Sequence, residues 1–98
     1  MTHAELLAEV LELAAARGVA CIVSHGVQST PGSTDLVLIG RGYQEVAFAE
    51  LKSEDGRRTR AQMAFGDRIN DIGFSCYLWR PADLEKGTVD EVLTRLGR

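Results

Sequence analysis

Apolar residues recur at helical spacing near the start of the sequence. In the stretch AELLAEVLELAAARG they would form one side of a helix, and Ala, Leu and Glu are good helix formers. The predicted inward residues are Leu7, Val10, Leu11 and Ala14. Thr2 followed by Glu5 is the pattern of a capping box, and Gly18 is a natural stop. We therefore expect a first helix between Thr2 and Gly18.

Three short apolar runs follow, and we expect each to form a β-strand. They cover residues 19–25, 35–40 and 45–52, and they contain many of the β-branched and aromatic side chains that favour strands. Turn-forming Gly, Pro, Ser and Thr residues separate the first two runs. Only residues 41–44 separate the last two, and so short a connection favours an antiparallel hairpin.

The second half of the sequence predicts a helix over residues 59–73 and a fourth strand over 74–79. The helix would turn inward Ala61, Phe65, Ile69 and Ile72. Pro81 permits a helical turn, and residues 88–96 predict a last helix. Its apolar side would carry Val89, Val92, Leu93 and Leu96. The order α-β-β-β-α-β-α predicts an α/β fold in which helices flank a four-stranded sheet on both faces.

Composition places the chain among ordinary globular proteins. Its 98 residues fit one domain, residues 1–98, and 45% of them are hydrophobic and 26% charged. No apolar run approaches the roughly 18 residues of a membrane span, and the start lacks the pattern of a secretory signal. We therefore expect a cytoplasmic protein without a membrane partner. The net charge of −3 argues against nucleic-acid binding through bulk positive charge, but it permits a site where acids hold a divalent cation.

The two cysteines give no metal or redox motif. Cys21 and Cys76 lie in apolar strand-like runs and not in a CxxC arrangement. They are interpreted as small buried hydrophobic residues in a reducing cytosol. A disulfide or a metal pair is the alternative.

Charged residues stand at the ends of two of the predicted strands. Side chains alternate along a strand, so Glu50 and Lys52 would point to one face. Asp35 opens the preceding run, and an antiparallel hairpin would place it beside Glu50. Two close carboxylates repel unless a cation lies between them, and Mg²⁺ is often held by one or two carboxylates. A neighbouring lysine could orient water or stabilise charge on a phosphate. The alternative is a salt bridge at a solvated rim.

The wider pattern resembles a known nuclease family. The stretch PGSTDLVLIG, then VAFAELKSEDGRRTRAQMAFGDRINDIGFSCYLWRPADL, is similar to the virus-type replication–repair nuclease (VRR-NUC) family of the PD-(D/E)xK superfamily. The shared features are a Gly-rich turn into Asp35, the Glu50-Leu51-Lys52 triplet, Gly56-Arg57, Gln62, and an aromatic strand ending at Pro81. Thr34 stands where the family usually has Pro, and Phe65 where Trp is common. The resemblance implies a restriction-endonuclease-like αβββαβ core with a mixed sheet.

The resemblance also implies roles for single residues. Asp35 and Glu50 would bind Mg²⁺ or Mn²⁺ with the backbone carbonyl of Leu51, and Lys52 would be the catalytic lysine. Gln62 would lie close to the site, and the first-helix acid of the family aligns best with Glu5, with Glu9 as the second choice. On periodicity alone, Glu5, Glu9 and Glu12 form a solvated helix stripe.

The function implied is that of a metal-dependent DNA endonuclease. Short members of the family resemble structure-selective nucleases that act on branched DNA as homodimers and leave 5′-phosphate and 3′-hydroxyl ends. Without a second DNA-binding domain, specificity would come from DNA shape. The alternatives are a nuclease-like module that binds DNA or a partner without cutting, and an α/β interaction domain without a metal.

Several other side chains have two interpretations. Arg57, Arg58 and Arg60 could contact the DNA backbone, or they form a charged loop balanced by nearby acids. His25 closes the first strand and is either a structural hydrogen-bonding group or a residue near the metal. Tyr77 and Trp79 share one face of the fourth strand and are interpreted as core or dimer contacts rather than base-stacking residues.

Overall fold

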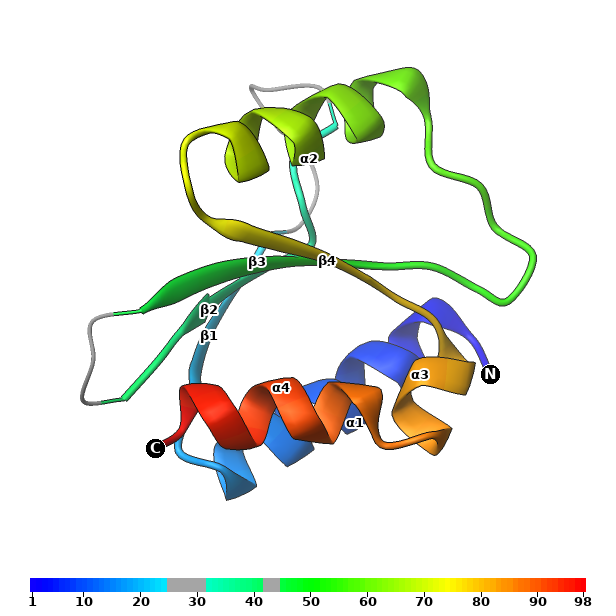
Figure 1. Ribbon diagram of the computed structural model, residues 1–98. Helices are drawn as coiled ribbons and strands as arrows, with labels where there is room; N and C mark the ends of the chain where they lie inside the picture. The colour runs from blue at the N-terminus through cyan, green and yellow to red at the C-terminus, as the bar shows by residue number, and fades with distance from the viewer. Residues whose placement is uncertain (25–31, 42–44) are drawn as a thin grey trace.

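Four strands form one sheet whose spatial order, β1-β2-β3-β4, follows the chain. The computed structural model describes residues 1–24, 32–41 and 45–98 (Figure 1). The elements are α1 (His3–Ala16), β1 (Ala20–Val23), β2 (Leu36–Ile39), β3 (Val46–Leu51), α2 (Arg60–Asp71), β4 (Ser75–Trp79), α3 (Pro81–Glu85) and α4 (Thr88–Leu96). The predicted α/β fold, with an αβββαβ core and a mixed four-stranded sheet, is confirmed. The observed strands are slightly shorter than the predicted ones.

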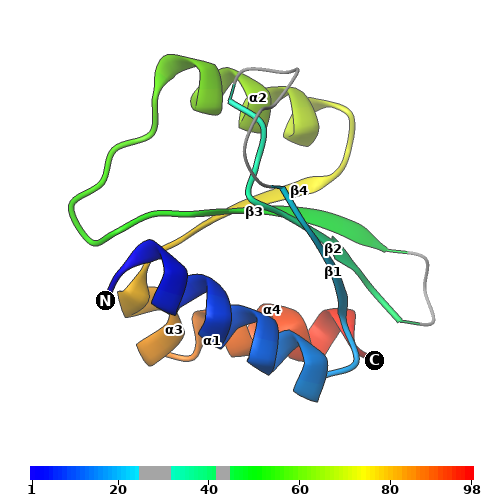
Figure 2. The same cartoon turned by 180° about the vertical axis from the view of Figure 1, so that it is seen from behind.

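The sheet is mixed because its last pair differs from the others. β1 pairs antiparallel with β2, and β2 pairs antiparallel with β3. β3 and β4 are parallel, which requires the long crossover connection that α2 supplies. This crossover places α2 on one face of the sheet, whereas α1, α3 and α4 lie on the other face (Figures 1 and 2).

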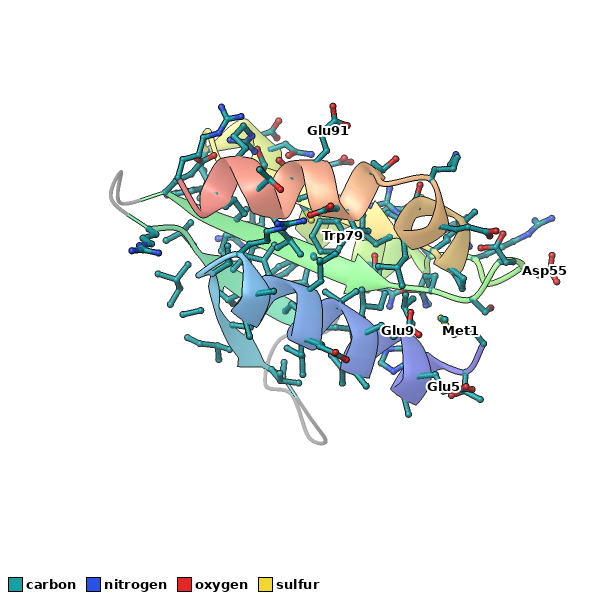
Figure 3. The ribbon with its side chains drawn as sticks, turned by 90° about the horizontal axis from the view of Figure 1, so that it is seen from below. Met1, Glu5, Glu9, Asp55, Trp79 and Glu91 are labelled. Carbon is teal, nitrogen blue, oxygen red and sulfur yellow. The ribbon has the colours of Figure 1, made fainter. Side chains whose placement is uncertain are left out.

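The main core lies between the sheet and the layer of α1 and α4. The strand side chains that point into it are Leu36, Leu38, Ala47, Ala49, Leu51 and Trp79. The helices contribute Leu6, Val10, Ala14, Val89, Leu93 and Leu96. Figure 3 shows Trp79 between α1 and α4, and its ring stacks on Tyr77 with the centroids 5.5 Å apart. Tyr77 and Trp79 therefore pack on the core side of the sheet.

The buried side of α1 is shifted toward Leu6 from the one that the spacing predicted. Leu6 is fully buried although the pattern did not single it out, while Leu7 and Leu11 are only partly buried against the core. Because α4 packs beside α1, the buried stripe runs through Leu6, Val10 and Ala14. Arg17 at the end of α1 donates to both carboxylate oxygens of Asp90 on α4, at 2.7 and 2.9 Å.

The prediction is wrong for one of the expected core residues of α2. Ile69 is buried, and Ala61 and Phe65 are partly buried, but Ile72 is 65% exposed. The helix ends at Asp71, so Ile72 is its C-cap and no longer follows the inward face. None of the helices in the described part of the chain combines the length and hydropathy that a membrane crossing needs.

Candidate functional site

The β2–β3 hairpin brings two carboxylates to the same place. Leu36 pairs with Ala49 in the antiparallel register, so the next pair outward is Asp35 and Glu50. The Asp35 Oδ2 atom accepts a hydrogen bond of 2.7 Å from the backbone N–H of Leu51, which fixes this carboxylate against β3. The hairpin predicted from the sequence is therefore confirmed, and so is the proximity of Asp35 and Glu50.

Glu50 is the buried member of this pair. Only 3% of the residue is exposed, and its Oε1 atom has no hydrogen-bond partner among the described residues. Burial raises the pKa of the Glu50 carboxyl. The positive charges of Lys52 and Arg58 oppose this rise in the pKa, and the negative charge of Asp35 adds to it. A buried acceptor without a partner is unusual in proteins and calls for an explanation.

Apolar neighbours account for the burial of Glu50. Its side chain shares a sheet face with Phe48, two residues earlier on β3, and with Leu78, its partner on β4. Phe48 also makes an edge-to-face contact with Phe74, with the ring centroids 6.3 Å apart. This is the face that α2 covers (Figure 1). An acid at the end of β3 is thus buried on the face that α2 covers, with apolar neighbours as well as the charges of Asp35, Lys52 and Arg58 near it.

Lys52 follows β3 directly and remains attached to the sheet. Its backbone N–H donates to the carbonyl oxygen of Trp79 at 3.0 Å, so the parallel pairing with β4 continues past the end of the strand. The side chain is half-buried, and its charge acts on Glu50. The aliphatic stem of Lys52 also lies next to Gly56, because a Cβ atom at position 56 would be 3.5 Å from the Lys52 Cδ.

The backbone of Leu51 also faces the carboxylates. Its N–H points to Asp35, and in an extended strand the N–H and C=O of one residue point to the same neighbouring strand. We therefore expect the Leu51 carbonyl oxygen on the Asp35 side. This is the side that the predicted metal ligation by Leu51 requires.

His3 is a neighbour of the site that the sequence did not reveal. Its Nε2 atom lies 3.6 Å from the Asp35 Oδ2, and its side chain is about half-exposed. The packing of α1 under the sheet brings the first turn of this helix to the start of β2. No local spacing links residues 3 and 35, so only the tertiary structure could show this contact.

Glu5 and Gln62 are held in helix caps. The Glu5 Oε1 accepts from the backbone N–H of Thr2 at 2.9 Å, which confirms the predicted capping box, and this hydrogen bond lowers the pKa of Glu5. The Gln62 Oε1 accepts from the Thr59 N–H at 2.8 Å in a second capping box. These bonds direct both side chains to their own helix ends. Glu9 is exposed on α1 (Figure 3), and it lines a surface hollow beside Leu84.

The turn that precedes Asp35 packs on the start of α2. Gly32 has φ +79°, and a Cβ atom there would overlap the carbonyl group of Ala61 and lie 2.6 Å from the Gln62 nitrogen. Only glycine permits this approach. Gln62 therefore lies beside the segment that leads into Asp35, although its side chain is used in the cap.

The three arginines after Lys52 do not form one surface. Arg57 and Arg60 are exposed, whereas Arg58 is half-buried. A Cβ atom at Gly66 would lie 3.3 Å from the Arg58 Nη1 and 3.5 Å from the Cys76 Sγ, so Arg58 reaches inward across α2. Its charge also acts on Glu50. The predicted arginine cluster is therefore divided into an inward cation and two outward ones.

The remaining candidates add no further ligand. Cys21 and Cys76 are free and partly buried, and burial raises the pKa of both thiols. His25 lies outside the described residues. Among the residues that are described, no three His, Cys, Asp or Glu side chains are grouped closely enough to hold a metal ion. Any cation would therefore depend on Asp35, Glu50, backbone oxygen and water, a donor set that suits Mg²⁺.

Comparisons with protein-family models, with curated proteins and with solved structures gave no match.

Proposed function

We propose that this protein is a Mg²⁺- or Mn²⁺-dependent endonuclease that hydrolyses phosphodiester bonds in DNA. The observation that carries the proposal is the buried Glu50 carboxylate, whose Oε1 atom has no hydrogen-bond partner in the described part of the chain, next to Asp35. Burying a charge without a partner is costly, and a cation shared with Asp35 would remove that cost. Among divalent ions, Mg²⁺ and Mn²⁺ favour carboxylate, carbonyl and water oxygens.

The side chains of the site divide the chemistry between them. Asp35 and Glu50 would hold the cation, with the Leu51 carbonyl oxygen beside them. When bound, such a cation activates water and neutralises charge on the phosphate. The Lys52 ammonium would orient the attacking water and stabilise the negative charge that grows on the phosphate oxygens. Arg57 and Arg60, which are exposed just beyond the site, would contact the DNA backbone.

The finer parts of the proposal come from the resemblance to the VRR-NUC family. These are a preference for branched DNA, products with 5′-phosphate and 3′-hydroxyl ends, and action as a homodimer. The intact set of Asp35, Glu50 and Lys52 supports a catalytic member of such a family.

A catalytically inactive module that binds DNA or a protein partner is the second candidate. It is favoured by the capping bonds of Glu5 and Gln62, since these bonds engage two expected site residues in their own helix caps. If the protein is catalytic without Glu5 and Gln62, its site consists of Asp35, Glu50 and Lys52 alone. Such a site is simpler than the family pattern.

The two candidate functions, endonuclease and inactive binding module, predict different effects of Lys52→Ala on DNA cleavage. Labelled linear, nicked, flapped and four-way DNAs would be incubated with the wild type and the variant in Mg²⁺ or Mn²⁺. The proposal expects the wild type to cut at least one of them, and expects Lys52→Ala to lose at least about 100-fold in rate, the scale seen when one charge-stabilising group is removed. Absence of cleavage by the wild type, combined with tight DNA binding, would favour the inactive module.

A further inference from the structure

Arg80 ties the loop after Lys52 to the end of β4. This arginine stands between Trp79 and the first residue of α3, and its Nη1 atom points to three carbonyl oxygens of the loop. The acceptors are Ser53 O at 2.6 Å, Gly56 O at 2.6 Å and Glu54 O at 3.3 Å. Among the described residues, the other hydrogen bond that holds residues 53–56 to another element is from the Ala82 N–H to Glu54 Oε1, at 2.7 Å.

The orientation of Arg80 is itself fixed. Its backbone N–H donates to Asp83 Oδ2 at 2.8 Å, and the preceding residue, Trp79, is buried in the core. A guanidinium group on a rigid base is a pre-organised donor, and hydrogen bonds from a charged donor are stronger than neutral ones. The loop is therefore held by a residue whose backbone is anchored to α3 and to the core.

This tether lies close to the candidate site. The carbonyl oxygen of Gly56 accepts from Arg80, and a Cβ atom built at Gly56 would be 3.5 Å from the Lys52 Cδ. Arg80 thus holds a loop that passes beside the Lys52 side chain. Asp35 and Glu50 have no such dependence, because the β2–β3 ladder and the Leu51 N–H position them.

We propose that Arg80 is a positioning residue for Lys52. Arg80 holds the loop of residues 53–56 in place beside the aliphatic part of the Lys52 side chain. The Lys52 ammonium group is thereby directed toward the two carboxylates. This inference rests on the function proposed above. It adds to the proposed site a residue that contacts neither metal nor DNA. Changing this residue should alter the catalytic rate and leave the metal affinity as it is.

Kinetics of the full chain provide the first test. Arg80→Ala is expected to lower kcat by about 10- to 100-fold, the range for a misplaced catalytic group, with KM and the Mn²⁺ affinity within about twofold. Arg80→Lys keeps a charged donor and is expected to recover part of kcat. Arg98→Ala removes an exposed cation that follows α4 and serves as the control for the loss of one positive charge. An unchanged kcat in Arg80→Ala would overturn the inference.

A second measurement does not depend on activity. Lys52 and Lys86 are the two lysines of the sequence, so reductive ¹³C-methylation gives one NMR signal from each, besides the signal of the N-terminal amine. Arg80→Ala should move the Lys52 signal toward that of exposed Lys86 and leave the Lys86 signal in place. Arg80→Met, which keeps an unbranched side chain and removes the hydrogen-bond donors, provides the same comparison if the alanine variant does not fold.

The two measurements distinguish the possible failures. An unmoved Lys52 signal would overturn the positioning role, whatever the activity. A wild type that cuts no DNA would overturn the proposed nuclease function, and the Lys52 signal would still decide whether Arg80 positions this lysine.

Discussion

Replacing Glu50 by Gln should stabilise the metal-free protein and abolish its response to Mn²⁺. The variant keeps the shape of the side chain and removes its charge. Glu50 is 3% exposed and its Oε1 has no partner among the described residues, so the charged form is held against a desolvation cost. Lys52 and Arg58 offset part of this cost.

The expected gain follows from the cost of one unsatisfied buried polar group. A buried group of this kind costs about 1–3 kcal/mol, and charge raises that figure. A neutral amide is cheaper to bury than a carboxylate but remains unpaired, so we expect Glu50→Gln to gain about 1–2 kcal/mol in free energy of unfolding at pH 8. For a chain of this size that corresponds to about 4–16 °C in Tm.

The sign of the pH dependence follows from the raised pKa of Glu50. The folded chain holds the Glu50 proton more tightly than the unfolded chain does. The stability of the wild type should therefore fall as the pH rises from the ordinary pKa of glutamate through the raised value of the folded state. Below this window Glu50 is neutral in both states, and the wild type and Glu50→Gln should differ little.

Mn²⁺ should reverse the order of the two proteins. At a free concentration 100 times its Kd, a ligand that binds only the folded state adds about 2.7 kcal/mol. We expect this gain in the wild type and not in Glu50→Gln.

The assay is urea or thermal unfolding at about pH 4, below the ordinary pKa of glutamate, and at about pH 8, in chelator and in Mn²⁺, with Glu85→Gln as the exposed control. A variant less stable than the wild type in chelator at pH 8 would refute the view that the buried charge of Glu50 is only partly compensated. Equal Mn²⁺ stabilisation of both proteins would refute its role as a ligand.

Two further predictions concern DNA and the turn before Asp35. Replacing the exposed Arg57 and Arg60 by Ala should weaken duplex binding and lower the slope of log Kd against log salt by about 2; an unchanged slope in a salt titration would count against both contacts. Gly32→Ala should destabilise the fold by more than Gly87→Ala. Both glycines have positive φ, which costs about 1–2 kcal/mol for alanine, but only a Cβ at position 32 meets the backbone of α2. Equal losses in urea unfolding would show that this packing is unimportant.

The elements of the fold could be predicted because their signals are local. Short apolar runs marked β2 and β3, the short connection between them implied the hairpin, and this hairpin was enough to place Asp35 beside Glu50. The capping pattern at Thr2 marked the start of α1 in the same way. Ile72 was wrong because periodicity alone does not show where a helix ends.

The surroundings of the site could not be predicted because they come from residues far apart in the sequence. His3 reaches Asp35 only through the packing of α1. The sequence suggests one basic cluster of Arg57, Arg58 and Arg60. Only the position of α2 in the fold shows that Arg58 points inward. The spacing of Glu5 fitted both a capping residue and a site residue, and the hydrogen bond to Thr2 shows which contact it makes.

The pairing of α4 with α1 has a consequence for how the chain is made. Three of the fully buried core residues, Val89, Leu93 and Leu96, belong to the last helix in the chain order. While α4 is still inside the ribosome, the apolar face of the nascent sheet is covered by α1 but not by α4. A stop codon placed just before Thr88 should therefore yield a product that chaperones retain and proteases remove, even though every residue of the candidate site would already have been synthesised.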